Sequence, residues 1–458
     1  MSLKEEIRVP IFTLIKNCYN QTCQDLVLLN SDVTNQLSSD LKKLFYFYNK
    51  KQYNQIKSIY ESIYKITWDK LLNEGSWNHI CLREAFIMGQ LAGASYYYTQ
   101  NDFNKVLEIL DLSFILGAPK EILIPFMTEC TNKLKEQPQS TGKEQKEIPM
   151  VLDENINYSE FPKINEANQI PIITCNSTSI NDQEYEKEFS NFKLNHLDPN
   201  KPCIIRGDAI QWSCINKWKD LNYFLNNYGN RLVPIELGHN KLYSKDKAPA
   251  SAEEQTQDWS EKVMKLNEFI ENFMVPSSID SNSIKTHSKN VGYLAQHGLI
   301  EQLPSLLDDF KFPKFLQSTG DAKVHETEEE GISPHVWFGT GNTITPLHYD
   351  SYDNFLSQIV GYKYVRLYHP NMKPYLYVKE HDEDGEGSSK TAQNNISLID
   401  IENPNLEKYP LFEKANSNYI ETILKPGDML FMPSGWWHYC RSLSPSFSLS
   451  FWFIKKNN

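Results

Sequence analysis

The chain has 458 residues and a formal net charge of −12, with 40% hydrophobic and 23% charged residues. This length predicts two or three domains rather than one core, and the composition excludes wholesale disorder. The negative charge argues against binding of a nucleic-acid backbone as the main activity, and it favours a basic protein or peptide partner.

Targeting and membrane signals are not apparent in the sequence. The first residues, MSLKEEIRVPIF, do not form a basic segment followed by an apolar run, and no stretch of about eighteen apolar residues occurs. The eight cysteines are scattered without a CxxC pair. We therefore expect a soluble intracellular protein with reduced thiols, without structural zinc and without a membrane partner.

The first part of the chain has helical periodicity. Residues 40–71 and 80–99 are amphipathic, and a further helix is predicted between Asp102, a typical N-cap residue, and Gly117. The apolar residues of that helix recur at intervals of three and four: Phe103, Val106, Leu107 and Leu110. We predict an α-helical N-terminal domain over residues 1–135, built as a small bundle of antiparallel helices.

A polar sequence, KLKEQPQSTGKEQKEIPM, follows at residues 133–150 and is nearly free of large apolar side chains. Such a composition is typical of an exposed connector. It predicts a polar linker over residues 136–155 and a catalytic domain over residues 156–458.

Short apolar or alternating runs, separated by Gly, Pro, Asn and Asp, dominate the second domain and predict strands. These runs are IPIIT, PCIIRG, LVPIEL, HVWFG, FLSQIVG, YKYVRLY, DMLFMP and FSLSFWF. Three polar stretches interrupt them, at about residues 240–258, 317–331 and 380–395, and are expected to be solvated surface loops. The second domain is therefore predicted to be built from β-sheet.

One motif in this domain has the spacing of a metal site. His348 and Asp350 are two residues apart, and on a strand this spacing directs both side chains to the same face. His438, in SGWWHYC, offers a third ligand. Two histidines and one carboxylate with open coordination positions are the arrangement used for non-haem iron(II) and oxygen chemistry.

Two other parts of the chain have similar spacing. His196 and Asp198 form a second HxD motif, followed at once by Pro199 and Asn200, while His381 begins an HxE motif in the acidic polar stretch. Neither is predicted to lie on a rigid inward strand face, so we interpret both as decoys.

Lys363, in KYVRLY, has the same strand parity as the apolar Val365 and Leu367 and is expected to point inward. A buried lysine requires an anion. A dicarboxylate such as 2-oxoglutarate would supply one, with its far carboxylate at the ammonium and its keto-acid end on the metal. The alternative is an edge strand, or a lysine whose stem is buried and whose ammonium reaches solvent.

At this point the sequence resembles the Jumonji-C oxygenases. It is most similar to the branch of Jumonji-C-domain-containing protein five, which includes lysine-specific demethylase eight and arginyl hydroxylases, over nearly all of residues 195–453. The similar strings are KPCIIRG, KLNEFI, VGYLAQHGLIEQLPSL, WFGTGNTITPLHYDSYDNFLSQIVGYKYVRLYHP, ENPNLEKYPLF and ILKPGDMLFMPSGWWHY. The resemblance implies an α+β protein whose double-stranded β-helix, or jelly roll, follows the helical domain.

The resemblance also implies roles for individual residues. His348, Asp350 and His438 would bind iron(II), and Lys363 would pair with 2-oxoglutarate. The cosubstrate pocket would be completed by Tyr293, Thr345 and Asn354. Near the substrate entrance would lie Glu236 and Trp337. Hydroxyl and amide groups suit carboxylate oxygens, and an acidic and an aromatic side chain suit a cation.

The implied activity is an oxygenase reaction that uses iron(II), 2-oxoglutarate and dioxygen to hydroxylate a protein arginine. Demethylation of a histone methyl-lysine is the alternative, and a non-catalytic interaction protein is a second one. A cupin-like metal enzyme without 2-oxoglutarate would leave the inward Lys363 unexplained. Candidate partners are histones, ribosomal proteins and other chromatin proteins, in the nucleus, the cytoplasm or both, as expected for a chromatin regulator.

Overall fold

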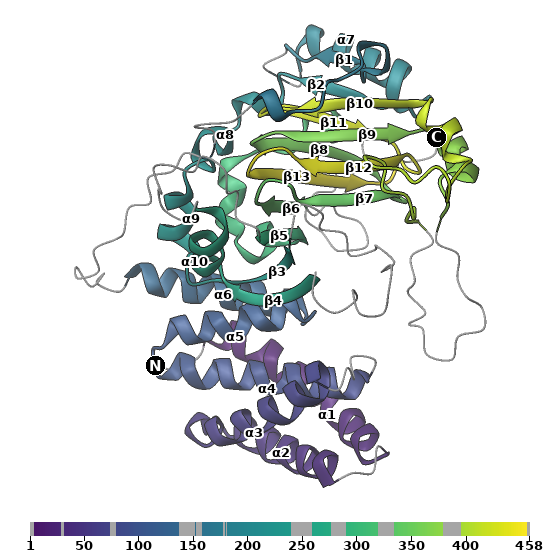
Figure 1. Ribbon diagram of the computed structural model, residues 1–458. Helices are drawn as coiled ribbons and strands as arrows, with labels where there is room; N and C mark the ends of the chain where they lie inside the picture. Colours follow the sequence, from purple (N-terminus) through teal and green to yellow (C-terminus); the bar gives the residue numbers. More distant parts are fainter. Residues whose placement is uncertain are drawn as a thin grey trace, which may run out of the picture. The chain divides into compact units, whose positions relative to one another are not determined.

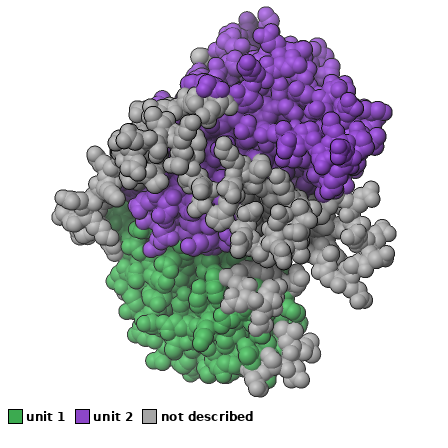
Figure 2. All heavy atoms as spheres, in the orientation of Figure 1, with its two compact units in different colours: residues 1–146, 230–233 green, residues 147–229, 234–458 purple. Residues whose placement is uncertain are grey.

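The structure is a computed structural model (Figure 1). It describes residues 4–28, 32–73, 79–136, 152, 158–176, 179, 181–239, 259–275, 290–318, 334–378 and 395–455. The predicted linker, the three predicted polar loops and His381 lie wholly or largely outside these residues. Two compact units are present, residues 1–146 with 230–233 and residues 147–229 with 234–458, and Figure 2 colours them separately.

The described elements of the first unit are helical, as the sequence predicts. The helices are α1 (Glu5–Leu28), α2 (Asp32–Asn49), α3 (Lys57–Trp68), α4 (Ile80–Thr99), α5 (Phe103–Ile115) and α6 (Lys120–Glu136). Asp102 caps α5, because its side chain accepts a hydrogen bond from the Lys105 N–H at 3.1 Å. Gly117 follows α5 with a φ of 81°, in the left-handed region that ends helices. None of the helices in the described parts of the chain is long and apolar enough to cross a membrane.

Within the described residues, the strands form two sheets. The order in the nine-stranded sheet is β1 (Ile172–Thr174), β2 (Cys203–Arg206), β11 (Asp428–Met432), β8 (Asp353–Val360), β13 (Ser446–Phe453), β6 (Pro334–Gly339), β5 (Asn290–His297), β3 (Leu232–His239) and β4 (Trp259–Lys265). The order in the four-stranded sheet is β10 (Tyr419–Leu424), β9 (Lys363–Tyr368), β12 (Trp437–Ser442) and β7 (Ile344–Tyr349).

The inner faces of the two sheets pack on each other through one apolar cluster. Leu356 and Leu430 come from the nine-stranded sheet, and Val365, Leu367 and Cys440 from the four-stranded sheet. Because strand side chains alternate, one face of each strand enters this core and the other faces outward. The predicted double-stranded β-helix is confirmed.

Short helices accompany the sheets. They are α7 (Gln183–Phe192), α8 (Cys214–Lys217), α9 (Leu221–Tyr228), α10 (Leu266–Phe269), α11 (Leu299–Gln302), α12 (Lys314–Ser318) and α13 (Phe412–Asn416). Helices α9 and α10 cover the outer face of the nine-stranded sheet, since Phe224 and Phe269 pack on Phe338 of β6 with ring centroids 5.7 Å and 5.5 Å apart. This packing leaves the inner face free for the site.

Candidate metal centre

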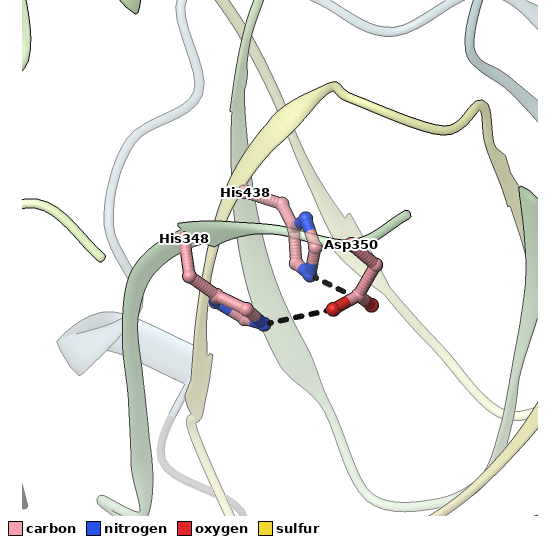
Figure 3. Close-up of side chains that lie close together, drawn as sticks. All are labelled: His348, Asp350 and His438. Atoms are coloured by element: carbon pink, nitrogen blue, oxygen red, sulfur yellow. Dashed lines mark ion pairs between the residues drawn. The ribbon is translucent and has the colours of Figure 1, made fainter. Parts of the chain in front are cut away.

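Three potential ligands meet at the four-stranded sheet. Strand β7 carries His348 and ends at Tyr349, so that Asp350 is the next residue rather than part of the strand. Strand β12 pairs with β7 and places His438 opposite His348. The Nε2 atoms of both histidines lie 3.7 Å from oxygens of Asp350, and Figure 3 shows the three side chains converging. The sequence-predicted ligands are therefore brought together.

Both imidazoles are held by main-chain carbonyl groups. The Nδ1 atom of His348 lies 2.8 Å from the carbonyl oxygen of Pro346, and that of His438 lies 3.1 Å from the carbonyl oxygen of Trp436. A carbonyl oxygen only accepts, so each Nδ1 carries the proton and each Nε2 keeps its lone pair. This is the tautomer that a metal requires, with both lone pairs near Asp350.

The charge states also suit a cation. Burial, followed by the neighbouring His348, lowers the pKa of His438 well below its usual range, so the ring stays neutral near pH 7. Two imidazoles and one carboxylate form a donor set that fits a divalent iron ion. In the described parts of the chain, this is the group of histidine, cysteine and acidic side chains with the geometry of a metal site.

Asp350 is oriented by Trp452 of β13. The indole Nε1 donates to Oδ2 of Asp350 at 3.2 Å. A Trp452→Phe variant keeps the ring volume but removes this donor. We expect it to bind Mn²⁺ or Co²⁺ about tenfold more weakly, the lower end of the usual effect of an outer-shell hydrogen bond. Isothermal titration of the metal checks this, and unchanged affinity would show that packing alone orients Asp350.

A pocket opens beside these ligands. Besides the three of them, it is lined by Tyr293, Gln296, Trp337, Thr345, Asn354, Leu356, Lys363, Met432, Cys440, Ser450 and Trp452. The inward faces of both sheets contribute to it. A chelating small molecule can therefore lie beside the metal ligands and between the sheets.

Lys363 lies at the start of β9 and is only 2% exposed. Strand β9 lies between β10 and β12, so the alternative of an edge strand is excluded. Burial lowers the pKa of Lys363 to about 8. Within the part of the chain that the structure describes, no carboxylate forms an ion pair with it. A buried ammonium without a counter-ion is stabilised by an anion, so Lys363 remains the predicted partner of an anionic ligand.

The other predicted cosubstrate residues line the same pocket. Tyr293 of β5 and Thr345 of β7 bring their hydroxyl groups to the pocket, and burial raises the pKa of Tyr293, so its hydroxyl remains protonated and can donate. Asn354 of β8 is buried, and its Nδ2 lies 3.4 Å from Oγ of Ser450. Among the described residues its Oδ1 has no hydrogen-bond partner. These polar groups are positioned for an oxygen-rich ligand.

The two predicted substrate residues differ in position. Trp337 lines the pocket and donates from Nε1 to Oγ of Ser450 at 2.9 Å. Glu236 lies on β3, opposite Tyr293 of β5, and is partly exposed, but it is not among the residues that line the pocket. The structure therefore brings Trp337 to the site. It places Glu236 on β3, the strand next to β5, outside the pocket lining.

Several pocket residues were not predicted. Ser450 and Trp452 share strand parity in FSLSFWF, which could have indicated a common inward face. Gln296 lies at a bulge of β5 and has a φ of 50°, a conformation that no sequence pattern announces. Cys440 lies two residues after His438 and has the same parity.

The decoy motif at His196 is helical. His196 lies in a helical turn, Lys193–Leu197, and Asp198 instead forms an ion pair with Lys193 at 3.0 Å. The two side chains are thus not presented on a strand face, in agreement with our interpretation.

Comparison with known proteins decides the family. Residues 189–458 match the family model of the cupin-like domain. The chain is 62% identical to JmjC domain-containing protein F of Dictyostelium discoideum, over 99% of this chain and 100% of the relative. The chain belongs to the cupin-like Jumonji-C family.

More distant relatives agree with this assignment. The chain is 32% identical to Lysine-specific demethylase 8 of Danio rerio, over 84% of this chain and 85% of the relative. It is 32% identical to Jumonji C domain-containing protein 5 of Drosophila melanogaster, over 56% of this chain and 57% of the relative. As a member of this Jumonji-C family, the protein is a 2-oxoglutarate-dependent oxygenase. The predicted family, fold and enzyme class are confirmed.

Proposed function

We propose that this Jumonji-C protein is an iron(II)- and 2-oxoglutarate-dependent dioxygenase that hydroxylates a protein side chain, with arginine as the favoured target. The observation that carries the proposal is the His348, Asp350 and His438 donor set, which opens into a pocket containing the buried, unpaired ammonium of Lys363. A metal chelate with a distant negative charge fits both features at once.

His348, Asp350 and His438 would hold iron(II) through two Nε2 atoms and one carboxylate oxygen. When bound, iron(II) together with 2-oxoglutarate supplies the dioxygen activation that hydroxylates a C–H bond. The protein contributes the fixed tautomers of the two histidines and the orientation of Asp350 by Trp452. These contacts hold the three ligand atoms close together, so a cosubstrate could reach the metal site from the pocket.

Lys363 would bind the far carboxylate of 2-oxoglutarate as a charge-assisted hydrogen-bond donor. Tyr293 and Thr345 can donate hydroxyl hydrogen bonds to the same group, and Asn354 can donate from its amide. Leu356 and Met432 contribute apolar surface to the pocket wall, and such surroundings strengthen polar contacts.

A basic protein side chain is the proposed substrate. Trp337 and Trp452 offer aromatic faces in the pocket. Glu236, which lies opposite the pocket residue Tyr293 on the neighbouring strand β3, would add a further carboxylate. Aromatic faces and carboxylates both attract a guanidinium group. Histones, ribosomal proteins and other chromatin proteins, in the nucleus or the cytoplasm, are the proposed partners.

Methyl-lysine demethylation is the second candidate function. It is favoured by the relative named Lysine-specific demethylase 8, and its chemistry differs only in which C–H bond faces the metal. A hydroxyl on an N-methyl carbon is released as formaldehyde, whereas a hydroxyl on a chain carbon persists.

Turnover of 2-oxoglutarate to succinate tests the proposal. The purified protein is incubated with iron(II), ascorbate and basic peptides that contain arginine or methylated lysine, beside an Asp350→Ala variant. We expect peptide-stimulated turnover that the variant loses by about 1,000-fold or more, because removal of a ligand abolishes the metal site. A peptide that gains one oxygen identifies a hydroxylase, and loss of a methyl group identifies a demethylase. No turnover with any peptide, and no 2-oxoglutarate binding, would refute the proposal.

A further inference from the structure

A single turn, residues 433–436, touches two of the three proposed metal ligands. The turn connects β11 to β12, and the carbonyl oxygen of Trp436 accepts the hydrogen bond from Nδ1 of His438. Gly435, which has a φ of 79°, donates its N–H to the carbonyl oxygen of Asp350 at 2.9 Å. The position of this turn therefore sets the ring orientation of His438 and restrains the main chain of Asp350.

Asp353 holds the turn from the side of β8. It is the first residue of that strand, its side chain is 6% exposed, and its Oδ1 accepts the N–H of Ser434 at 2.9 Å. The same oxygen lies 3.6 Å from Nζ of Lys455. One carboxylate oxygen thus joins the main chain of the turn to a cation.

Lys455, which follows β13, reaches the turn by a second route. Its ammonium donates to the carbonyl oxygen of Leu197 at 2.7 Å and to Oδ1 of Asn200. The carbonyl oxygen of Asn200 in turn accepts the indole N–H of Trp436 at 2.9 Å. Lys455 is therefore connected to both ends of the turn, through Asp353 to Ser434 and through Asn200 to Trp436.

The electrostatics of this pair do not favour a role in stability alone. Burial raises the pKa of Asp353 and lowers the pKa of Lys455, so each charge is disfavoured in its surroundings. A buried ion pair often contributes no more to stability than apolar side chains of the same size would. The pair instead fixes the positions of the groups that it contacts through hydrogen bonds.

We propose that Asp353 and Lys455 are positioning residues of the metal centre, which hold the 433–436 turn so that the Trp436 carbonyl fixes the imidazole of His438 for metal binding. The inference rests on the proposed metal site. It assigns to two residues outside the pocket an effect on metal affinity rather than on cosubstrate contact.

Metal titration of the full-length protein tests this inference. Mn²⁺ or Co²⁺ binding is measured by calorimetry for the wild type and for Asp353→Leu, Lys455→Met and Asp353→Asn. We expect the metal Kd to rise about tenfold in Asp353→Leu and several-fold in Lys455→Met, as for other outer-shell changes. Asp353→Asn keeps an oxygen for the Ser434 N–H and is expected to stay within about threefold of the wild type.

The ion pair of Arg206 with Asp428 provides the matched control. It lies in the same nine-stranded sheet, with a 2.8 Å contact, and within the described residues its side chains form hydrogen bonds with each other and with the Lys425 N–H, not with residues 433–436. An Asp428→Asn variant is expected to lower the Tm and leave the metal Kd unchanged. If it weakens metal binding as much as Asp353→Leu does, or if Asp353→Leu binds metal like the wild type, the inference is wrong. If the wild type itself binds no metal, the proposed metal centre fails, and the inference fails with it.

Discussion

A Lys363→Met variant is expected to bind 2-oxoglutarate about 100-fold more weakly than the wild type, because one charge-assisted hydrogen bond in a dry pocket is lost. Methionine has a similar length and an apolar character, so the inner core between the sheets should remain packed. The metal ligands are untouched, and Mn²⁺ affinity should not change. Calorimetry with 2-oxoglutarate, in the presence of saturating Mn²⁺, measures the loss.

The pH dependence of cosubstrate binding gives an independent check on Lys363. Burial holds the pKa of Lys363 at about 8, and a bound carboxylate would raise that pKa. The affinity for 2-oxoglutarate should therefore be highest below pH 8 and fall as the pH rises above it. Lys363→Met should lose this dependence, while a change at the exposed Lys425 should retain it. A pH-independent wild type would exclude Lys363 as the anion partner.

Local sequence patterns were sufficient to predict site residues whose side-chain direction depends only on the alternation within their own strand. Lys363 could be placed inward because Val365 and Leu367 share its parity, and all three lie on the inner side of the four-stranded sheet. The spacing of His348 and Asp350 worked in the same way, although Asp350 lies just past the end of β7.

The remaining features depend on pairing between distant segments, which no local pattern encodes. The register that sets His438 opposite His348 joins strands far apart in the chain. The Trp452 contact with Asp350 likewise joins distant segments. The main-chain acceptors for both histidines, in contrast, lie two residues before each of them. Strands β4, β5, β7, β10 and β12 were not among the predicted runs, because their polar residues face the site or solvent and weaken the apolar alternation.

Folding of the catalytic unit should depend strongly on Asp309, a residue without any motif. Its side chain is 2% exposed and accepts hydrogen bonds from Lys217, Trp218 and Tyr223, as well as from a serine hydroxyl. Removing one partner from such a cluster leaves buried donors unpaired, and Trp218 is fully buried. We expect Asp309→Ala to lower the free energy of unfolding by about 3–4 kcal/mol.

Chemical denaturation of Asp309→Ala and Asp308→Ala separates the effect of the buried hydrogen bonds from the loss of a charge. Asp308 is the exposed neighbour, so Asp308→Ala should lower the free energy of unfolding by about 0.5 kcal/mol or less. The hydrogen bonds from Lys217, Tyr223 and Trp218 hold the pKa of Asp309 below its ordinary value. Its contribution to stability is therefore complete above the unfolded pKa of about 4 and is lost as the pH falls through the lower folded value. The stability difference between the wild type and Asp309→Ala should accordingly be constant from pH 5 to 8 and shrink only in stronger acid. A difference that shrinks already above pH 5 would mean that Asp309 is protonated in the folded protein, and that its four donors do not stabilise the carboxylate.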